Sequence, residues 1–123
     1  MSSIFKDFFN SRPDDKKPSE IKYQNEKPEN KEHIKIKAQV YGVVQGVGFR
    51  YTTKHLADQL KVSGIVRNEN DGSVYIEALG SDQQINRFIE ELAKGPSPSA
   101  NVDRVVIEYD DSIPDYEGFG ERY

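Results

Sequence analysis

Apolar and polar residues alternate along positions 34–41, which is the pattern of a β-strand with one buried face. The apolar members of this alternation are Ile34, Ile36, Ala38 and Val40. The same period of two returns at 74–78, and β-branched residues are dense at 64–68 and 102–109. We therefore predict four strands at these positions, and a short last strand within 116–123.

Helical spacing of apolar residues predicts two helices between these strands. The first helix carries Phe49, Thr53, Leu56, Ala57 and Leu60, and the second carries Ile85, Phe88, Ile89 and Leu92. Ser81 and Gln84 have the spacing of a capping box at the start of the second helix. Gly95 followed by Pro96 is expected to end that helix.

The order of these elements is β-α-β-β-α-β, with a hairpin turn at Asp71-Gly72 between the second and third strands. That order is typical of an α+β ferredoxin-like sandwich. We expect an antiparallel sheet that is covered on one face by the two helices, with right-handed crossovers. A chain of 123 residues suits a single domain.

Residues 1–32 differ in composition from the rest of the chain. They contain three prolines and balance seven basic against seven acidic residues, so little apolar area is available to offset the entropy of ordering. We predict a disordered N-terminal tail over 1–32 and one domain over 33–123. The apolar residues Ile4, Phe5, Phe8 and Phe9 would share one face of a short helix, which is either a transient turn or a docking segment for a partner.

Composition narrows the chemistry further. The chain has no cysteine and only two histidines, His33 and His55, which excludes disulfides and thiolate chemistry and argues against a zinc site. We therefore expect no metal and no cofactor. A net charge of −4 argues against nucleic-acid binding. The sequence has neither an apolar stretch long enough to cross a membrane nor a secretory signal, and nothing in it suggests an obligate partner, so we expect a cytoplasmic monomer.

A glycine-rich loop at 42–48 joins the first predicted strand to the first predicted helix. Main-chain N–H groups at a helix N-terminus are unpaired and carry partial positive charge, so this loop could bind a phosphate. Arg50 follows in the first helical turn, where its guanidinium could bind two phosphate oxygens at once. On the residues alone, a structural turn and a solvent-exposed arginine are the simpler interpretations.

Asn68 is a second candidate, because it lies at the end of the second predicted strand, just before the turn. An asparagine there either stabilises the turn through its own backbone or holds a water without adding charge near an anion. The other candidates are weaker. His55 has no neighbour suited to a catalytic triad, the acidic pairs are typical of solvated surfaces, and Arg67 should point to the opposite side of its strand from Asn68.

Two longer motifs agree with each other: GVVQGVGFR at 42–50 and GIVRNENDGSV at 64–74. In this order and at this spacing, they resemble the acylphosphatase family. The resemblance implies a metal-independent hydrolase that converts small-molecule acyl phosphates to a carboxylate and inorganic phosphate, without a covalent enzyme intermediate. It assigns the attacking water to Asn68, and phosphoryl binding to Arg50 and the main-chain amides of Gln45, Gly46, Val47, Gly48 and Phe49.

The chain departs from the family pattern at three places. Lys61 stands where a glycine often ends the first helix, and Ile65 stands where an aromatic residue is common. Gly120 and Glu121 interrupt an apolar alternation in the last strand. We expect none of these departures to touch the site.

Two other functions remain open beside the hydrolase. The same loop could bind a phosphate without turnover, which would make the protein a binding module. A nucleic-acid binder on the ferredoxin-like sheet is less compatible with the acidic charge of the domain.

Overall fold

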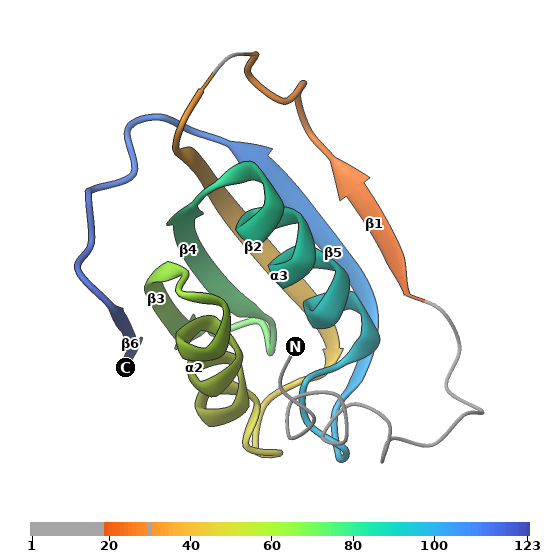
Figure 1. Ribbon diagram of the computed structural model, residues 1–123. Coiled ribbons are helices and arrows are strands. Elements are labelled where there is room, and N and C mark those ends of the chain that lie inside the picture. The colour runs from red at the N-terminus through yellow and green to blue at the C-terminus, as the bar shows by residue number, and fades with distance from the viewer. Residues whose placement is uncertain (1–18, 30) are drawn as a thin grey trace.

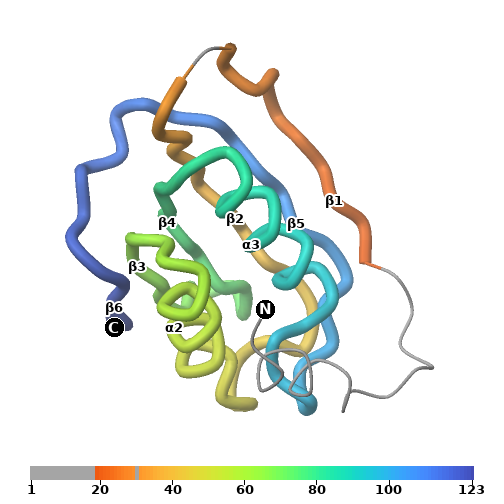
Figure 2. Tube along the Cα trace, in the orientation of Figure 1, coloured from red at the N-terminus to blue at the C-terminus, as the bar shows by residue number. Residues whose placement is uncertain are grey.

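A computed structural model describes residues 19–29 and 31–123. The described elements are β1 (Glu20–Tyr23), β2 (Ile34–Val43), α2 (Phe49–Leu60), β3 (Ser63–Asn68), β4 (Val74–Gly80), α3 (Asp82–Lys94), β5 (Asn101–Tyr109) and β6 (Phe119–Arg122). The strands form one sheet in the order β1-β5-β2-β4-β3-β6. Both helices pack on the same face of that sheet, as Figure 1 and the trace in Figure 2 show. This is the α+β arrangement that the sequence predicts.

The central part of the sheet follows the predicted order. β5, β2, β4 and β3 are neighbours, and each adjacent pair among them is antiparallel. The capping box of α3 is also confirmed. Gln84 donates its main-chain N–H to Ser81 Oγ over 3.2 Å, and the Ser81 N–H donates to Gln84 Oε1 over 2.7 Å.

The two edge strands correct the expectation of a purely antiparallel sheet. β1 runs parallel to β5, and β6 runs parallel to β3, so the sheet is mixed. The reason lies in the connections. β1 leads through a loop into β2, so the two strands have opposite directions. β5 lies between them in the sheet and is antiparallel to β2, so it is parallel to β1. β6 returns from the end of β5, which is the end of the sheet where β3 begins.

Strand β1 also corrects the predicted boundary, because the predicted disorder of residues 1–32 does not extend over it. Gln24 donates its main-chain N–H to the Ile107 carbonyl oxygen over 2.8 Å. The Asn25 side chain donates to the Tyr109 carbonyl oxygen and accepts the Tyr109 N–H, both over 2.9 Å. Composition misses such pairing because the partners are main-chain groups of a sheet edge, which any sequence carries. The apolar face predicted within residues 4–9 lies outside the described residues.

The core lies between the helices and the sheet. The four apolar residues of the β2 alternation are each at most 2% exposed, which confirms the predicted buried face. Phe88 of α3 packs edge-on against Phe119 of β6, with ring centroids 6.0 Å apart. Phe119 therefore anchors the last strand in the core, and this fixes the positions of the residues that follow it.

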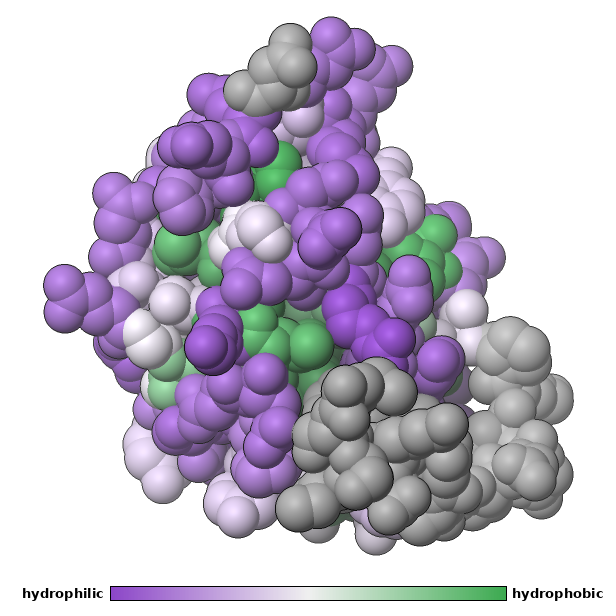
Figure 3. Space-filling view, in the orientation of Figure 1, coloured by the Kyte–Doolittle hydropathy of each residue, from purple (hydrophilic) through white to green (hydrophobic). Residues whose placement is uncertain are grey.

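The surface over the helices is mostly hydrophilic, with apolar residues in small separate areas (Figure 3). Within the described residues, neither helix has the length and apolar character needed to cross a membrane.

Candidate active site

The glycine-rich loop connects β2 to α2 and begins the helix with an unusual backbone. Gly46 has φ 73°, and Gly48, the N-cap of α2, has φ 76°. These left-handed conformations favour glycine, because a side chain there is strained by its own backbone. Gly48 has no side chain that could cap the helix, so the main-chain N–H groups of the first turn remain available to a ligand.

Two side chains, those of Gln45 and Ser97, hold this loop by hydrogen bonds. Gln45 Nε2 donates to the carbonyl oxygens of Glu69 and Ser73, over 2.7 and 2.8 Å, which ties the loop to the β3–β4 turn. Ser97 Oγ donates to the Val47 carbonyl oxygen over 2.8 Å, which ties it to the segment after α3. The loop is therefore preorganised, so little backbone entropy is lost when an anion binds to it.

A cavity of about 150 Å³ opens at this loop. Its lining residues are Val44, Gly46, Gly48, Phe49, Arg50, Tyr51, Asn68 and Glu121. The tertiary structure thus brings Arg50 and Asn68, predicted separately, to the same site. Gln45 and Val47 do not line the cavity: the Gln45 side chain holds the loop, and the Val47 main-chain carbonyl oxygen accepts the hydrogen bond from Ser97. A cavity of this size, lined by Arg50, Asn68 and Glu121, suits a small polar ligand.

Arg50 lies in the first turn of α2 and is held by the end of the last strand. Its Nη1 donates to the Arg122 carbonyl oxygen over 2.8 Å. Its guanidinium carbon also lies 4.7 Å from the centroid of the Tyr123 ring, a cation–π contact. The sequence pattern does not reveal this support, because it joins segments at opposite ends of the domain.

Asn68 ends β3 beside the cavity. Its Oδ1 is buried and has no hydrogen-bond partner among the described residues. Buried polar atoms are normally satisfied, by water when not by protein. The turn that Asn68 precedes is stabilised by another side chain: Asp71 Oδ1 accepts the Ser73 N–H over 2.9 Å. Hydrogen bonds from the Ser73 hydroxyl and N–H hold the pKa of Asp71 below its usual value. The turn therefore does not use the Asn68 amide oxygen, which has no protein partner among the described residues.

Glu121 overturns the expectation that the departures from the family pattern do not touch the site. It lines the cavity together with Arg50 and Asn68. Sequence reasoning missed it because the position of β6 depends on the parallel pairing with β3, which no local pattern encodes. One signal in the sequence could have identified Glu121. Side chains alternate along a strand, so Glu121 lies on the same face as Phe119, two residues earlier.

The weaker candidates do not line the cavity, but one of them departs from the expectation: Glu91, of the acidic pair at 90–91, is not solvated but 1% exposed, in ion pairs with Arg87 and Lys94. The His55 ring stacks on Tyr51, with centroids 6.5 Å apart, and His55 does not line the cavity. The Arg67 guanidinium stacks on the Tyr75 ring at 4.4 Å, away from the cavity that Asn68 lines. Among the described residues, no group of three or more His, Cys, Asp or Glu side chains could hold a metal ion.

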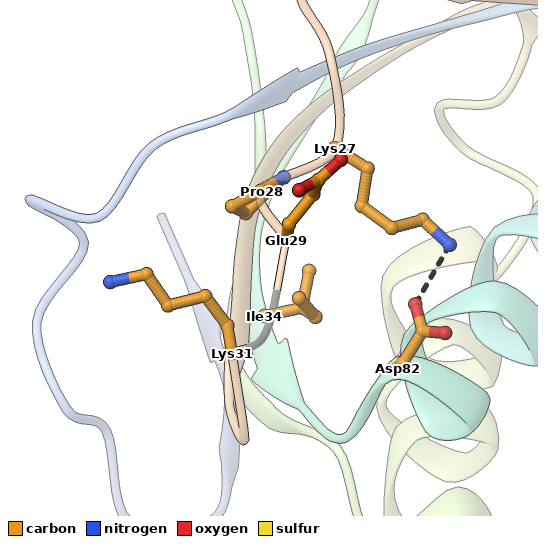
Figure 4. Close-up of a pocket in the computed structure, with 6 residues that line it drawn as sticks. All are labelled: Lys27, Pro28, Glu29, Lys31, Ile34 and Asp82. Carbon is orange, nitrogen blue, oxygen red and sulfur yellow. Dashed lines mark hydrogen bonds and ion pairs between the residues drawn. The ribbon is translucent and has the colours of Figure 1, made fainter.

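A second cavity, of about 370 Å³, lies between the segment that follows β1 and the start of α3 (Figure 4). It shares no lining residue with the first cavity. Lys27 Nζ lies 2.8 Å from Asp82 Oδ1, and Lys31 Nζ lies 3.6 Å from Asp111 Oδ2. Since both lysines are engaged in ion pairs, we assign no anion site to this cavity.

Comparisons with known proteins give one consistent result. The acylphosphatase family model matches residues 36–120. An acylphosphatase of Listeria welshimeri is 47% identical over 84 residues, which are 68% of this chain and 90% of the relative. An acylphosphatase of Thermotoga maritima is 47% identical over 89 residues, 72% of this chain and 96% of the relative. The crystal structure of acylphosphatase from Bacillus subtilis matches with a TM-score of 0.70 and 34% identity, over 73% of this chain and 99% of that one.

Proposed function

Because this chain belongs to the acylphosphatase family and hydrolyses acyl phosphates, we propose that Arg50 and Asn68 carry the reaction in the cavity at the start of α2. The observation that carries the proposal is that both residues line one cavity with Gly46 and Gly48 of the anion-binding loop. The phosphoryl group lies against the loop, bound by the main-chain amides of residues 45–49 and by the Arg50 guanidinium. Its oxygens gain charge in the transition state, where fixed donors stabilise them most.

Asn68 holds the attacking water. Its buried Oδ1 accepts a hydrogen bond from that water, which fixes the water without adding a second negative charge beside the phosphoryl group. The water oxygen forms a bond to phosphorus, and the bond from phosphorus to the acyl oxygen breaks. The carboxylate leaves with the electron pair, and a phosphoryl oxygen takes the proton of the water.

An acyl phosphate needs little more than this from the protein. The carboxylate is a good leaving group, so positioning and charge stabilisation supply the catalysis. Preorganisation of the loop by Gln45 and Ser97 supports the proposal, since catalytic dipoles must be oriented before the reaction. We further propose that the acylphosphatase-like part of the chain lies within residues 33–123, with β1 added at the edge of its sheet, and that the protein acts as a monomer. The absence of cysteine fits a reducing compartment such as the cytoplasm.

Turnover of acetyl phosphate by the purified protein tests the proposal, with and without EDTA. We expect hydrolysis that is unchanged by the chelator and competitively inhibited by inorganic phosphate. Binding of inorganic phosphate without turnover would instead identify a phosphate-binding module. Loss of activity in EDTA that added metal restores would contradict the metal-independent mechanism.

A further inference from the structure

Glu121 is the one acidic residue that lines the proposed active site, among the residues the structure describes. Its position is fixed by β6. Phe119 lies two residues earlier on the same face of the strand and is buried in the core, 6% exposed. Glu121 pairs with Val66 in the parallel register between β6 and β3, two residues before Asn68. The side chain therefore stands on the helix side of the sheet, at the mouth of the cavity.

The charge of Glu121 is not neutralised by a close ion pair. Within the described residues, no Lys, Arg or His nitrogen lies within 4.0 Å of its carboxylate. The nearby Arg50 is engaged by the Arg122 carbonyl oxygen and by the Tyr123 ring. The Glu121 side chain is exposed, so its carboxylate can meet whatever part of a ligand extends beyond the phosphoryl group.

A carboxylate beside a phosphate site repels the negative charge of the phosphoryl group, which every acyl phosphate substrate carries. That repulsion is common to all acyl phosphates and does not distinguish them. The acyl group differs between substrates, and it extends from the phosphoryl group into the part of the cavity that the exposed Glu121 lines. The acyl group is therefore the part of the substrate whose charge Glu121 can distinguish.

Resting on the proposed function, we propose that Glu121 sets the specificity of the enzyme by the charge of the acyl group. It favours acyl phosphates whose acyl group carries an ammonium over those whose acyl group carries a second carboxylate. Two unit charges 4 Å apart in water interact by about 1 kcal/mol, which is about fivefold in kcat/KM per unit of acyl charge. A cationic and an anionic acyl group differ by two units, so the preference is about 25-fold. It should weaken as salt screens the charges.

Three matched substrates measure this preference: crotonoyl phosphate, fumaroyl phosphate and γ-aminocrotonoyl phosphate. They share a trans double bond, which prevents the acyl end from closing onto the carbonyl. They differ in carrying a methyl group, a carboxylate or an ammonium at the far end. We compare kcat/KM for the cationic substrate with kcat/KM for the anionic one. Glu121 repels the phosphoryl group of both substrates equally, so this repulsion does not affect the ratio.

We expect wild-type protein to prefer the cationic substrate by about 25-fold at low ionic strength, Glu121→Gln to abolish that preference, and Glu121→Lys to reverse it. Glu117→Gln is the matched control, because Glu117 is exposed four residues away and does not line the cavity; its ratio should equal the wild-type ratio. An unchanged ratio in Glu121→Gln, with crotonoyl phosphate still hydrolysed, overturns this inference alone. A wild-type protein that hydrolyses acetyl phosphate but none of the three substrates overturns this inference alone, whereas one that hydrolyses neither acetyl phosphate nor any of the three overturns the proposed function as well.

Discussion

Arg50 donates a hydrogen bond from Nη1 to the main-chain carbonyl oxygen of Arg122, and the two atoms lie 2.8 Å apart. Arg50 lies in the first turn of α2 and Arg122 ends β6, so the bond joins the start of the first described helix to the end of the last strand. The guanidinium is therefore oriented before any ligand arrives. Less side-chain entropy is lost when it binds a phosphoryl group, which strengthens binding without a further contact.

Arg50→Ala should abolish most turnover while leaving the fold intact. The substitution removes the charged donor that we assign to the phosphoryl group, and such a loss typically lowers kcat by about 10²- to 10³-fold. Acetyl phosphate hydrolysis measures the effect. Arg104→Ala is the matched control, because Arg104 stacks on Tyr41 and does not line the cavity. Near-normal hydrolysis by Arg50→Ala would remove this arginine from the site.

Tyr123→Ala should raise the KM for acetyl phosphate and the inhibition constant of inorganic phosphate, each by about two- to fivefold. The lost contact is a cation–π interaction at an exposed site, which is worth about 0.5–1 kcal/mol. Arg122→Ala should behave like the wild type, since it keeps the carbonyl oxygen that accepts from Arg50. An unchanged KM in Tyr123→Ala would show that the ring does not support Arg50.

Asn68→Ala should lower kcat on the order of 10²-fold, the typical cost of a misplaced reactant, and leave inhibition by inorganic phosphate nearly unchanged. We assign Asn68 to the attacking water and Arg50 to the phosphoryl group. Asn68→Ala should therefore lower kcat without weakening phosphate binding, whereas Arg50→Ala should affect the bound anion itself. Asn70→Ala, in the exposed turn two residues later, is the control. A turn-stabilising role predicts the opposite result: a lower denaturant midpoint with normal kcat.

Lys61→Gly should raise the free energy of unfolding by about 0.5–1 kcal/mol. Lys61 ends α2 with φ 59° and ψ 39°, the one non-glycine residue with positive φ in the described part of the chain. A lysine there is strained by about 1–2 kcal/mol, of which the greater freedom of glycine in the unfolded chain cancels part. Urea denaturation measures the change, with Lys54→Gly, inside the same helix, as a control that should destabilise. A lower urea midpoint for Lys61→Gly would show that the lysine side chain stabilises the fold by more than its backbone strain destabilises it.

Asn25→Ala should loosen the pairing of β1 with β5. The substitution removes two hydrogen bonds to the Tyr109 main chain, and a typical net loss is about 1 kcal/mol per bond, less where water can replace the partner. Faster hydrogen exchange at the Tyr109 amide reports the loosening, and catalysis should not change. Glu26→Ala, at the next exposed position, is the control. Equal exchange rates in the two variants would show that the Asn25 side chain does not hold the strand.

The sequence by itself determined the elements from β2 to β6 and their order. The alternation along β2, the apolar stripes of the helices and the Ser81 capping box are local patterns, and each depends only on the geometry of the strand or helix that carries it. The two motifs that resemble the acylphosphatase family likewise identified Arg50 and Asn68 as candidates, because each motif is continuous in the chain.

Only the tertiary structure decided the edges of the sheet and the surroundings of the site. β1 is held by main-chain hydrogen bonds to the edge of β5, and composition cannot report these because they do not depend on side-chain identity. The contact of Arg50 with Arg122 and the presence of Glu121 in the cavity both depend on where β6 pairs. That pairing joins residues far apart in the chain, so it is set by the packing of Phe119 into a core that exists only once the rest has folded.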